Sequence, residues 1–93
     1  MKIQDLLHSA TWIVAQNLTP NIVQARIVWN STARILSLTY VTRKTPSDDD
    51  IDLCELSISE LIAEYPDIDG AETACVVANA LEPGASDYIV YSR

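Results

Sequence analysis

Apolar residues recur at helical spacing in two stretches of the chain. In residues 3–17 they form one stripe, made of Ile3, Leu6, Leu7, Ala10, Ile13 and Val14. In residues 48–65 the stripe is Ile51, Cys54, Ile58, Leu61, Ile62 and Tyr65. A single stripe of this period is typical of an amphipathic helix packed on a core. Pro20 and Pro66 follow the two stretches, and Ser47 is a suitable N-cap for the second helix.

The second helix has a competing interpretation. Ser57-Ile58-Ser59-Glu60 matches a capping box, which would begin a helix at residue 58 and make residues 50–56 a strand. We favour one helix over residues 48–65, because a single stripe then accounts for six apolar positions.

Alternating apolar residues predict two strands between these helices. Residues 23–29 place apolar side chains at every second position, and residues 34–42 are rich in the β-branched and aromatic residues that favour strands. Turn formers in residues 30–32 join the strands into an antiparallel hairpin. The buried face of the second strand stays ambiguous, because apolar residues lie on both of its sides.

The C-terminal part of the chain is predicted as a second hairpin. Its strands are residues 72–78 and 87–92, and its loop is residues 79–86. The element order is therefore α-β-β-α-β-β. We expect a single α/β domain of the α+β type over residues 1–93, with two helices on one face of an antiparallel sheet. The expected core includes Leu6, Leu7, Ile13, Ile27, Ile58, Leu61 and Ile62.

Charge divides the chain into two unequal halves. Residues 1–47 carry five bases and one acid, a net charge of +4, whereas residues 48–93 carry twelve acids and one base, a net charge of −11. The window from Asp48 to Glu72 holds ten acids and no base. Such a run is either a solvated face or a surface for a basic partner, and the lack of any interleaved lysine favours the second interpretation.

The residue inventory excludes several functional classes. A net charge of −7 argues against binding to nucleic acid or to an anionic membrane, and no apolar run is long enough to span a bilayer. His8 is the only histidine, and Cys54 and Cys75 are expected to be reduced core residues, so no metal or cofactor site is predicted. No nucleotide-binding or catalytic motif occurs, which argues against an enzyme. The N-terminus lacks the apolar stretch of a signal peptide, so we expect a cytoplasmic location.

The outer face of the second helix is the strongest candidate for a binding surface. Acids alternate there with two leucines, a composition typical of protein-binding sites. The leucines could instead pack on the first helix or on a second copy of the chain. Trp12 falls on the polar side of the first helix, which is uncommon for tryptophan. The predicted partner-binding residues are Trp12, Asp48, Asp49, Asp50, Asp52, Leu53, Leu56 and Glu60.

The acidic helix resembles part of a known class of proteins. Pro46-Ser47-Asp48-Asp49-Asp50, followed by the run Ile-Ser-Glu-Leu-Ile-Ala-Glu-Tyr-Pro-Asp-Ile over residues 58–68, is similar to the second helix of some bacterial immunity proteins. These proteins protect cells from colicin-type or contact-dependent growth inhibition toxins.

The resemblance implies stoichiometric, non-catalytic inhibition of a basic toxin, a nuclease in particular, whose active site or nucleic-acid groove is covered. We also expect the free protein to be a monomer. Two alternatives stay open. A small acidic secretion chaperone or other protein-binding adaptor would share this composition, and a small hydrolase would need a catalytic pocket that no motif identifies.

Overall fold

The computed structural model describes residues 2–78 and 87–93. Its elements in chain order are α1 (Ile3–Ala15), β1 (Ile22–Asn30), β2 (Ile35–Thr42), α2 (Asp48–Glu64), β3 (Gly70–Val77) and β4 (Tyr88–Ser92). The predicted α+β class and the order α-β-β-α-β-β are confirmed. Residues 50–56 lie inside α2, so the alternative that made them a strand is wrong.

The four strands form one mixed sheet in the order β3-β2-β1-β4. β1 and β2 form the predicted hairpin, and β4 pairs antiparallel with β1. β3 instead pairs parallel with β2, so the prediction of a wholly antiparallel sheet with a β3–β4 hairpin is wrong. The physical reason is the connection: α2 carries the chain back along the sheet, and the next strand therefore runs in the same direction as β2. The predicted loop at residues 79–86 lies outside the described residues.

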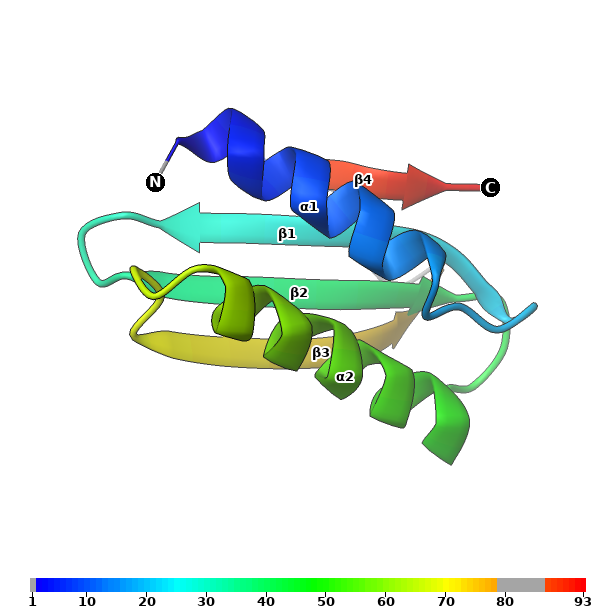
Figure 1. Ribbon diagram of the computed structural model, residues 1–93. Coiled ribbons are helices and arrows are strands. Elements are labelled where there is room, and N and C mark those ends of the chain that lie inside the picture. The colour runs from blue at the N-terminus through cyan, green and yellow to red at the C-terminus, as the bar shows by residue number, and fades with distance from the viewer. Residues whose placement is uncertain (1, 79–86) are drawn as a thin grey trace.

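Both helices lie on one face of the sheet, as Figure 1 shows, with α1 over β1 and β4 and α2 over β2 and β3. The core fills the space between the two layers. Five of the seven predicted core residues are buried, while Leu7 and Ile62 are partly buried and pack against the core. The ambiguous strand β2 turns Leu36, Leu38 and Tyr40 toward the helices, because these residues pair with the buried side of β1.

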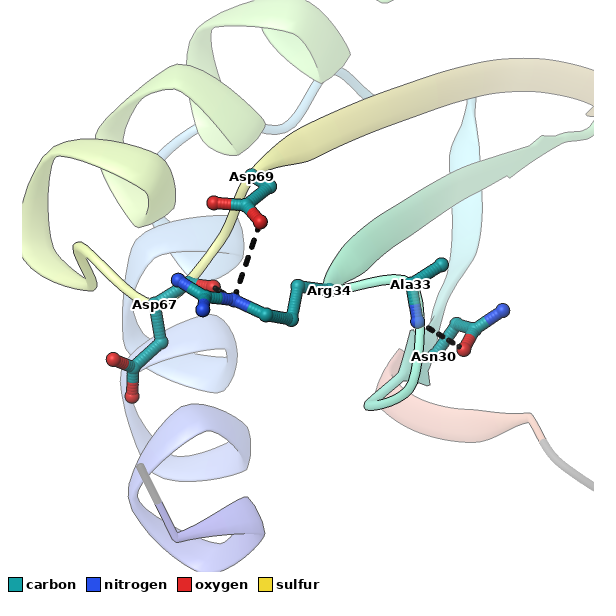
Figure 2. A network of polar contacts seen from close by, with 5 residues as sticks. All are labelled: Asn30, Ala33, Arg34, Asp67 and Asp69. Carbon is teal, nitrogen blue, oxygen red and sulfur yellow. Dashed lines mark hydrogen bonds and ion pairs between the residues drawn. The ribbon is translucent and has the colours of Figure 1, made fainter.

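The β1–β2 turn also holds the beginning of β3 (Figure 2). Arg34 has a φ of 59°, and its carbonyl oxygen accepts hydrogen bonds from the N–H groups of Asp69 at 2.8 Å and Gly70 at 3.2 Å. Its guanidinium Nε donates to the carbonyl oxygen of Asp67 at 2.9 Å and lies 3.3 Å from Asp69 Oδ2. The ion pair is exposed and contributes little stability, whereas the backbone bonds fix where β3 starts beside β2.

Candidate functional site

Asp50 is fully buried, which corrects its prediction as a partner-binding residue. It closes a capping box: Ser47 N–H donates to Asp50 Oδ2 at 2.9 Å, and Asp50 N–H donates to Ser47 Oγ at 3.2 Å. Thr19 Oγ1 donates to Asp50 Oδ1 at 2.5 Å, and Asn21 Nδ2 donates to Asp50 Oδ2 at 2.8 Å. Burial opposes ionisation, but these hydrogen bonds outweigh it and hold the pKa of Asp50 below its usual range. Asp50 is therefore a structural link between α2 and the segment after α1.

The remaining acids predicted on α2 are exposed. Asp48, Asp49, Asp52 and Glu60 all lie at the surface, and Leu56 is 47% exposed. Asp49, Asp52 and Glu60 lie on one side of α2. The helix rises by about 16 Å from Asp49 to Glu60, so these three side chains form a long acidic strip. Leu53, which was also predicted on this strip, is instead partly buried and packs against the core. Of the two leucines, Leu56 therefore offers the larger apolar contact area to a partner.

Trp12 stands on the outer surface of α1 with 66% of its area exposed. It borders two shallow hollows. One, of about 390 Å³, lies along α1 and is lined mostly by apolar atoms of Leu7, His8, Thr11, Trp12 and Ala15. The other, of about 270 Å³, is lined by His8, Ser9, Trp12 and Glu64. Because Glu64 belongs to α2, the second hollow brings the tryptophan and the acidic helix together.

Side-chain contacts between the helices make this surface continuous. Asn17 Nδ2 at the end of α1 donates to Glu60 Oε1 at 3.3 Å, and Ser9 Oγ donates to Glu64 Oε1 at 2.9 Å. Ser9 Oγ also lies 2.6 Å from the hydroxyl of Tyr65, whose hydroxyl is 2.8 Å from the carbonyl oxygen of Asp5. We call this area the helix-layer surface. It consists of Trp12, Asp49, Asp52, Leu56, Glu60 and Glu64.

Glu64 was missed by the sequence reasoning. It follows Glu60 by four positions, so both carboxylates lie on the same side of α2. That spacing could have identified it. Its proximity to Trp12 could not have been found in this way, because it depends on how α1 and α2 cross.

The hollow between α2 and β3 corrects another expectation. Ile51 belongs to the predicted buried stripe of α2 but is 41% exposed. It lines a hollow of about 390 Å³ together with Pro46, Cys54, Glu55, Thr73, Ala74 and Cys75. In the part of the chain that the structure describes, the sheet ends at β3, so no strand lies beneath this part of α2 and Ile51 stays exposed.

Burial raises the pKa values of three side chains near the core, Cys54, Cys75 and Tyr40. Cys54 and Cys75 are free thiols, and burial raises the pKa of Cys54 to about 12 and raises that of Cys75 as well. Burial also raises the pKa of Tyr40 to about 12, although a hydrogen bond with Ser57 opposes the shift. Among residues 2–78 and 87–93, no group of three or more His, Cys, Asp or Glu residues could hold a metal ion. In the same part of the chain, neither helix is long and apolar enough to cross a membrane.

The surface built by α1 and α2 therefore combines an exposed aromatic residue with carboxylates, and residues of both types are common in protein-binding sites. No curated protein matches the chain. One family model does match, that of the MafI2 immunity proteins, and the match covers residues 4–93. The chain thus belongs to the MafI2 immunity protein family, whose members neutralise toxins.

Proposed function

We propose that this protein neutralises a basic toxin, a nuclease in particular, by binding it one to one through the helix-layer surface. The single observation that carries the proposal is the hollow shared by Trp12 and Glu64, where an exposed aromatic side chain is bordered by a carboxylate. Tryptophan is enriched among the residues that dominate binding energy, and nearby carboxylates pair with Lys or Arg of a partner.

The charge of the surface supports a cationic partner. A nuclease holds the phosphates of its substrate with Lys and Arg side chains, and carboxylates can occupy the same positions. Asp49, Asp52 and Glu60 offer such groups along about 16 Å of α2. A surface of this length, extended by α1, is of the order needed for a standard protein–protein interface of about 800 Å² on each partner.

In this proposal the immunity protein acts by occlusion and carries out no reaction. It would meet its toxin in the cytoplasm, as a free monomer that binds the active site or the nucleic-acid groove. Opposite charges on the two proteins accelerate their encounter, which suits an inhibitor that has to act before the toxin reaches its substrate.

The test uses calorimetry to measure the affinity of the protein for the purified domain of its cognate toxin. The test variants are Trp12→Ala and the double variant Asp49→Asn/Asp52→Asn, which raises the net charge by two. The control is Ser31→Lys/Thr32→Lys, which raises the net charge by the same amount at the exposed β1–β2 turn. Thermal melts confirm that each variant is folded.

We expect Trp12→Ala to weaken binding by about tenfold or more, and the double variant to weaken it measurably, while the control changes it by less than about twofold. Reversing Asp49, Asp52 and Glu60 to Lys should abolish growth protection by the folded variant. If that triple variant folds and still protects cells fully, the acidic strip is a solubility feature and the proposal is wrong.

A further inference from the structure

Within residues 2–78 and 87–93, no strand pairs with the outer edge of β3. In the described residues β3 pairs only with β2, and its outer side has no strand partner. The N–H groups of Gly70 and Ala78 donate to the carbonyl oxygens of Arg34 and Thr42 in line with β2. Alternate residues of a parallel strand direct their backbone groups to opposite sides. The N–H and C=O groups of Ala71, Thr73 and Cys75 therefore point away from the sheet.

The two edges of the sheet differ in how well they resist pairing. β4 is five residues long and has a register shift against β1, features that make an edge strand a poor template. β3 is eight residues long, and its register with β2 is regular throughout. It contains no Pro or Lys, and the side chains of Ala71, Thr73 and Ala74 are small and exposed. By these criteria β3 is the edge suited to accept another strand.

An apolar hollow runs beside this edge. Ile51 and Pro46 line it from the side of α2, and Thr73, Ala74 and Cys75 line it from β3. Figure 1 shows the beginning of α2 extending beyond β3, where a further strand would lie beneath the helix. Such a strand would bury the exposed part of Ile51, whose sequence pattern is that of a core residue.

The charge around the hollow identifies the chemistry of the occupant. Glu55 lines the hollow, and the helical repeat places Asp48 on the same side of α2 as Glu55. Glu72 is exposed on the opposite face of β3, where its carboxylate accepts a hydrogen bond from Ser37 Oγ. No Lys or Arg occurs in residues 46–77. A second copy of the chain would bring its own Glu72 and Glu55 against these acids, so like charges disfavour a dimer at this edge. A strand with Lys or Arg side chains fits.

We propose that an extended basic segment of the toxin adds to the sheet as a fifth strand at the outer edge of β3, with an apolar side chain in the hollow next to Ile51. The inference rests on the proposed function, because the toxin supplies the strand. The edge adjoins the helix-layer surface through the first turns of α2, so one partner can contact both. Main-chain hydrogen bonds supply affinity in this mode of binding, and the side-chain hollow supplies specificity.

Hydrogen exchange of individual amides, measured by NMR with and without the purified toxin domain, tests the pairing directly. The N–H groups of Glu72 and Ala74 bond to β2 and should exchange slowly in both states. The N–H groups of Ala71, Thr73 and Cys75 should exchange rapidly in the free protein and become protected by about tenfold or more in the complex. Unchanged exchange at these three amides in a saturated complex would overturn the inference.

A substitution at the edge provides a second measurement. Thr73→Pro removes an outward N–H group and leaves the bonds to β2 in place, because edge strands tolerate proline where the N–H group faces solvent. We expect it to weaken toxin binding by about tenfold or more, whereas Thr73→Val keeps the outward N–H group and should bind the toxin clearly more tightly than Thr73→Pro does. If Thr73→Pro does not melt cooperatively, Thr73→Lys replaces it, since a lysine at the edge repels a basic strand while keeping the backbone donor.

The outcomes separate this inference from the proposed function. Suppose that folded Thr73→Pro binds the toxin with wild-type affinity, while reversal of the acidic strip still abolishes binding. The edge pairing is then wrong, and the helix-layer surface remains the binding site. A wild-type protein that does not bind the toxin overturns both. A wild-type protein that forms dimers in solution, with Thr73→Pro monomeric, shows that the occupant is a second copy and also overturns the inference.

Discussion

Replacing Asp50 by Asn should destabilise the protein far more than the same change at its neighbour Asp49. Asp50 is fully buried and accepts hydrogen bonds from Thr19, Asn21 and the N–H group of Ser47. Asparagine has the same shape but no charge. Its amide NH₂ group takes the place of one carboxylate oxygen and cannot accept the hydrogen bonds that this oxygen accepts in Asp50. Asp49 is exposed, so Asp49→Asn serves as the matched control.

The expected loss follows from the three hydrogen bonds. Each bond to a charged group contributes about 1.5–3 kcal/mol, and leaving a buried donor unsatisfied costs about 1–3 kcal/mol. Asparagine keeps one oxygen that can accept, and the variant no longer has to bury a charge. We therefore expect Asp50→Asn to lower the free energy of unfolding by about 2–4 kcal/mol, and Asp49→Asn to change it by less than about 0.5 kcal/mol.

Urea unfolding at a series of pH values measures both effects. The pKa of Asp50 is lowered in the folded state, so its ionised form stabilises the fold above the pKa of the unfolded chain, about 3.9 for Asp. The difference between the wild type and Asp50→Asn should be complete near neutral pH and shrink as the pH falls through the folded-state pKa. A difference below about 0.5 kcal/mol at neutral pH, or one that does not change with acid, would refute this account of the buried carboxylate.

Three further predictions concern the core, the thiols and the charge of the surface. Leu61→Ala should cost about 2–5 kcal/mol in urea unfolding, because Leu61 is fully buried between α2 and the sheet, and a loss below about 1 kcal/mol would contradict that placement. Burial raises the pKa of Cys54 to about 12. In a Cys75→Ala variant, Cys54 should therefore react with a thiol reagent at mildly alkaline pH only after unfolding, and rapid reaction of the folded variant would be inconsistent with a buried thiol. The association rate with the toxin should fall steeply as salt rises, and a rate independent of salt would exclude electrostatic steering by the acidic strip.

Local patterns in the sequence predict the helices, the β1–β2 hairpin and most of the core, because each depends on residues close together in the chain. The Ser47 cap is of this kind, since its partner Asp50 is three positions away. The burial of Asp50 could not be predicted, because Thr19 and Asn21 reach it from a distant segment. From sequence alone, a carboxylate at a helix start is expected to face water.

The pairing of β3 shows the same limit. Its sequence is compatible with a neighbour on either side of the sheet, and the short distance in sequence to β4 favours a hairpin. The actual partner, β2, is selected by the path of α2 and by the backbone bonds from Asp69 and Gly70 to Arg34. The exposure of Ile51 follows from that choice, because it places the end of the sheet beneath α2.

The parallel pairing of β2 and β3 also has a chiral consequence. A strand–helix–strand connection between parallel neighbours is almost always right-handed, as it is in Figure 1. Since β1 already occupies one side of β2, β3 has to take the other side, and handedness then decides on which face of the sheet α2 lies. α1 has to share that face to complete the core. The stereochemistry of L-amino acids therefore places Trp12 and the acidic residues on the same side of the sheet, independently of the contacts between the two helices.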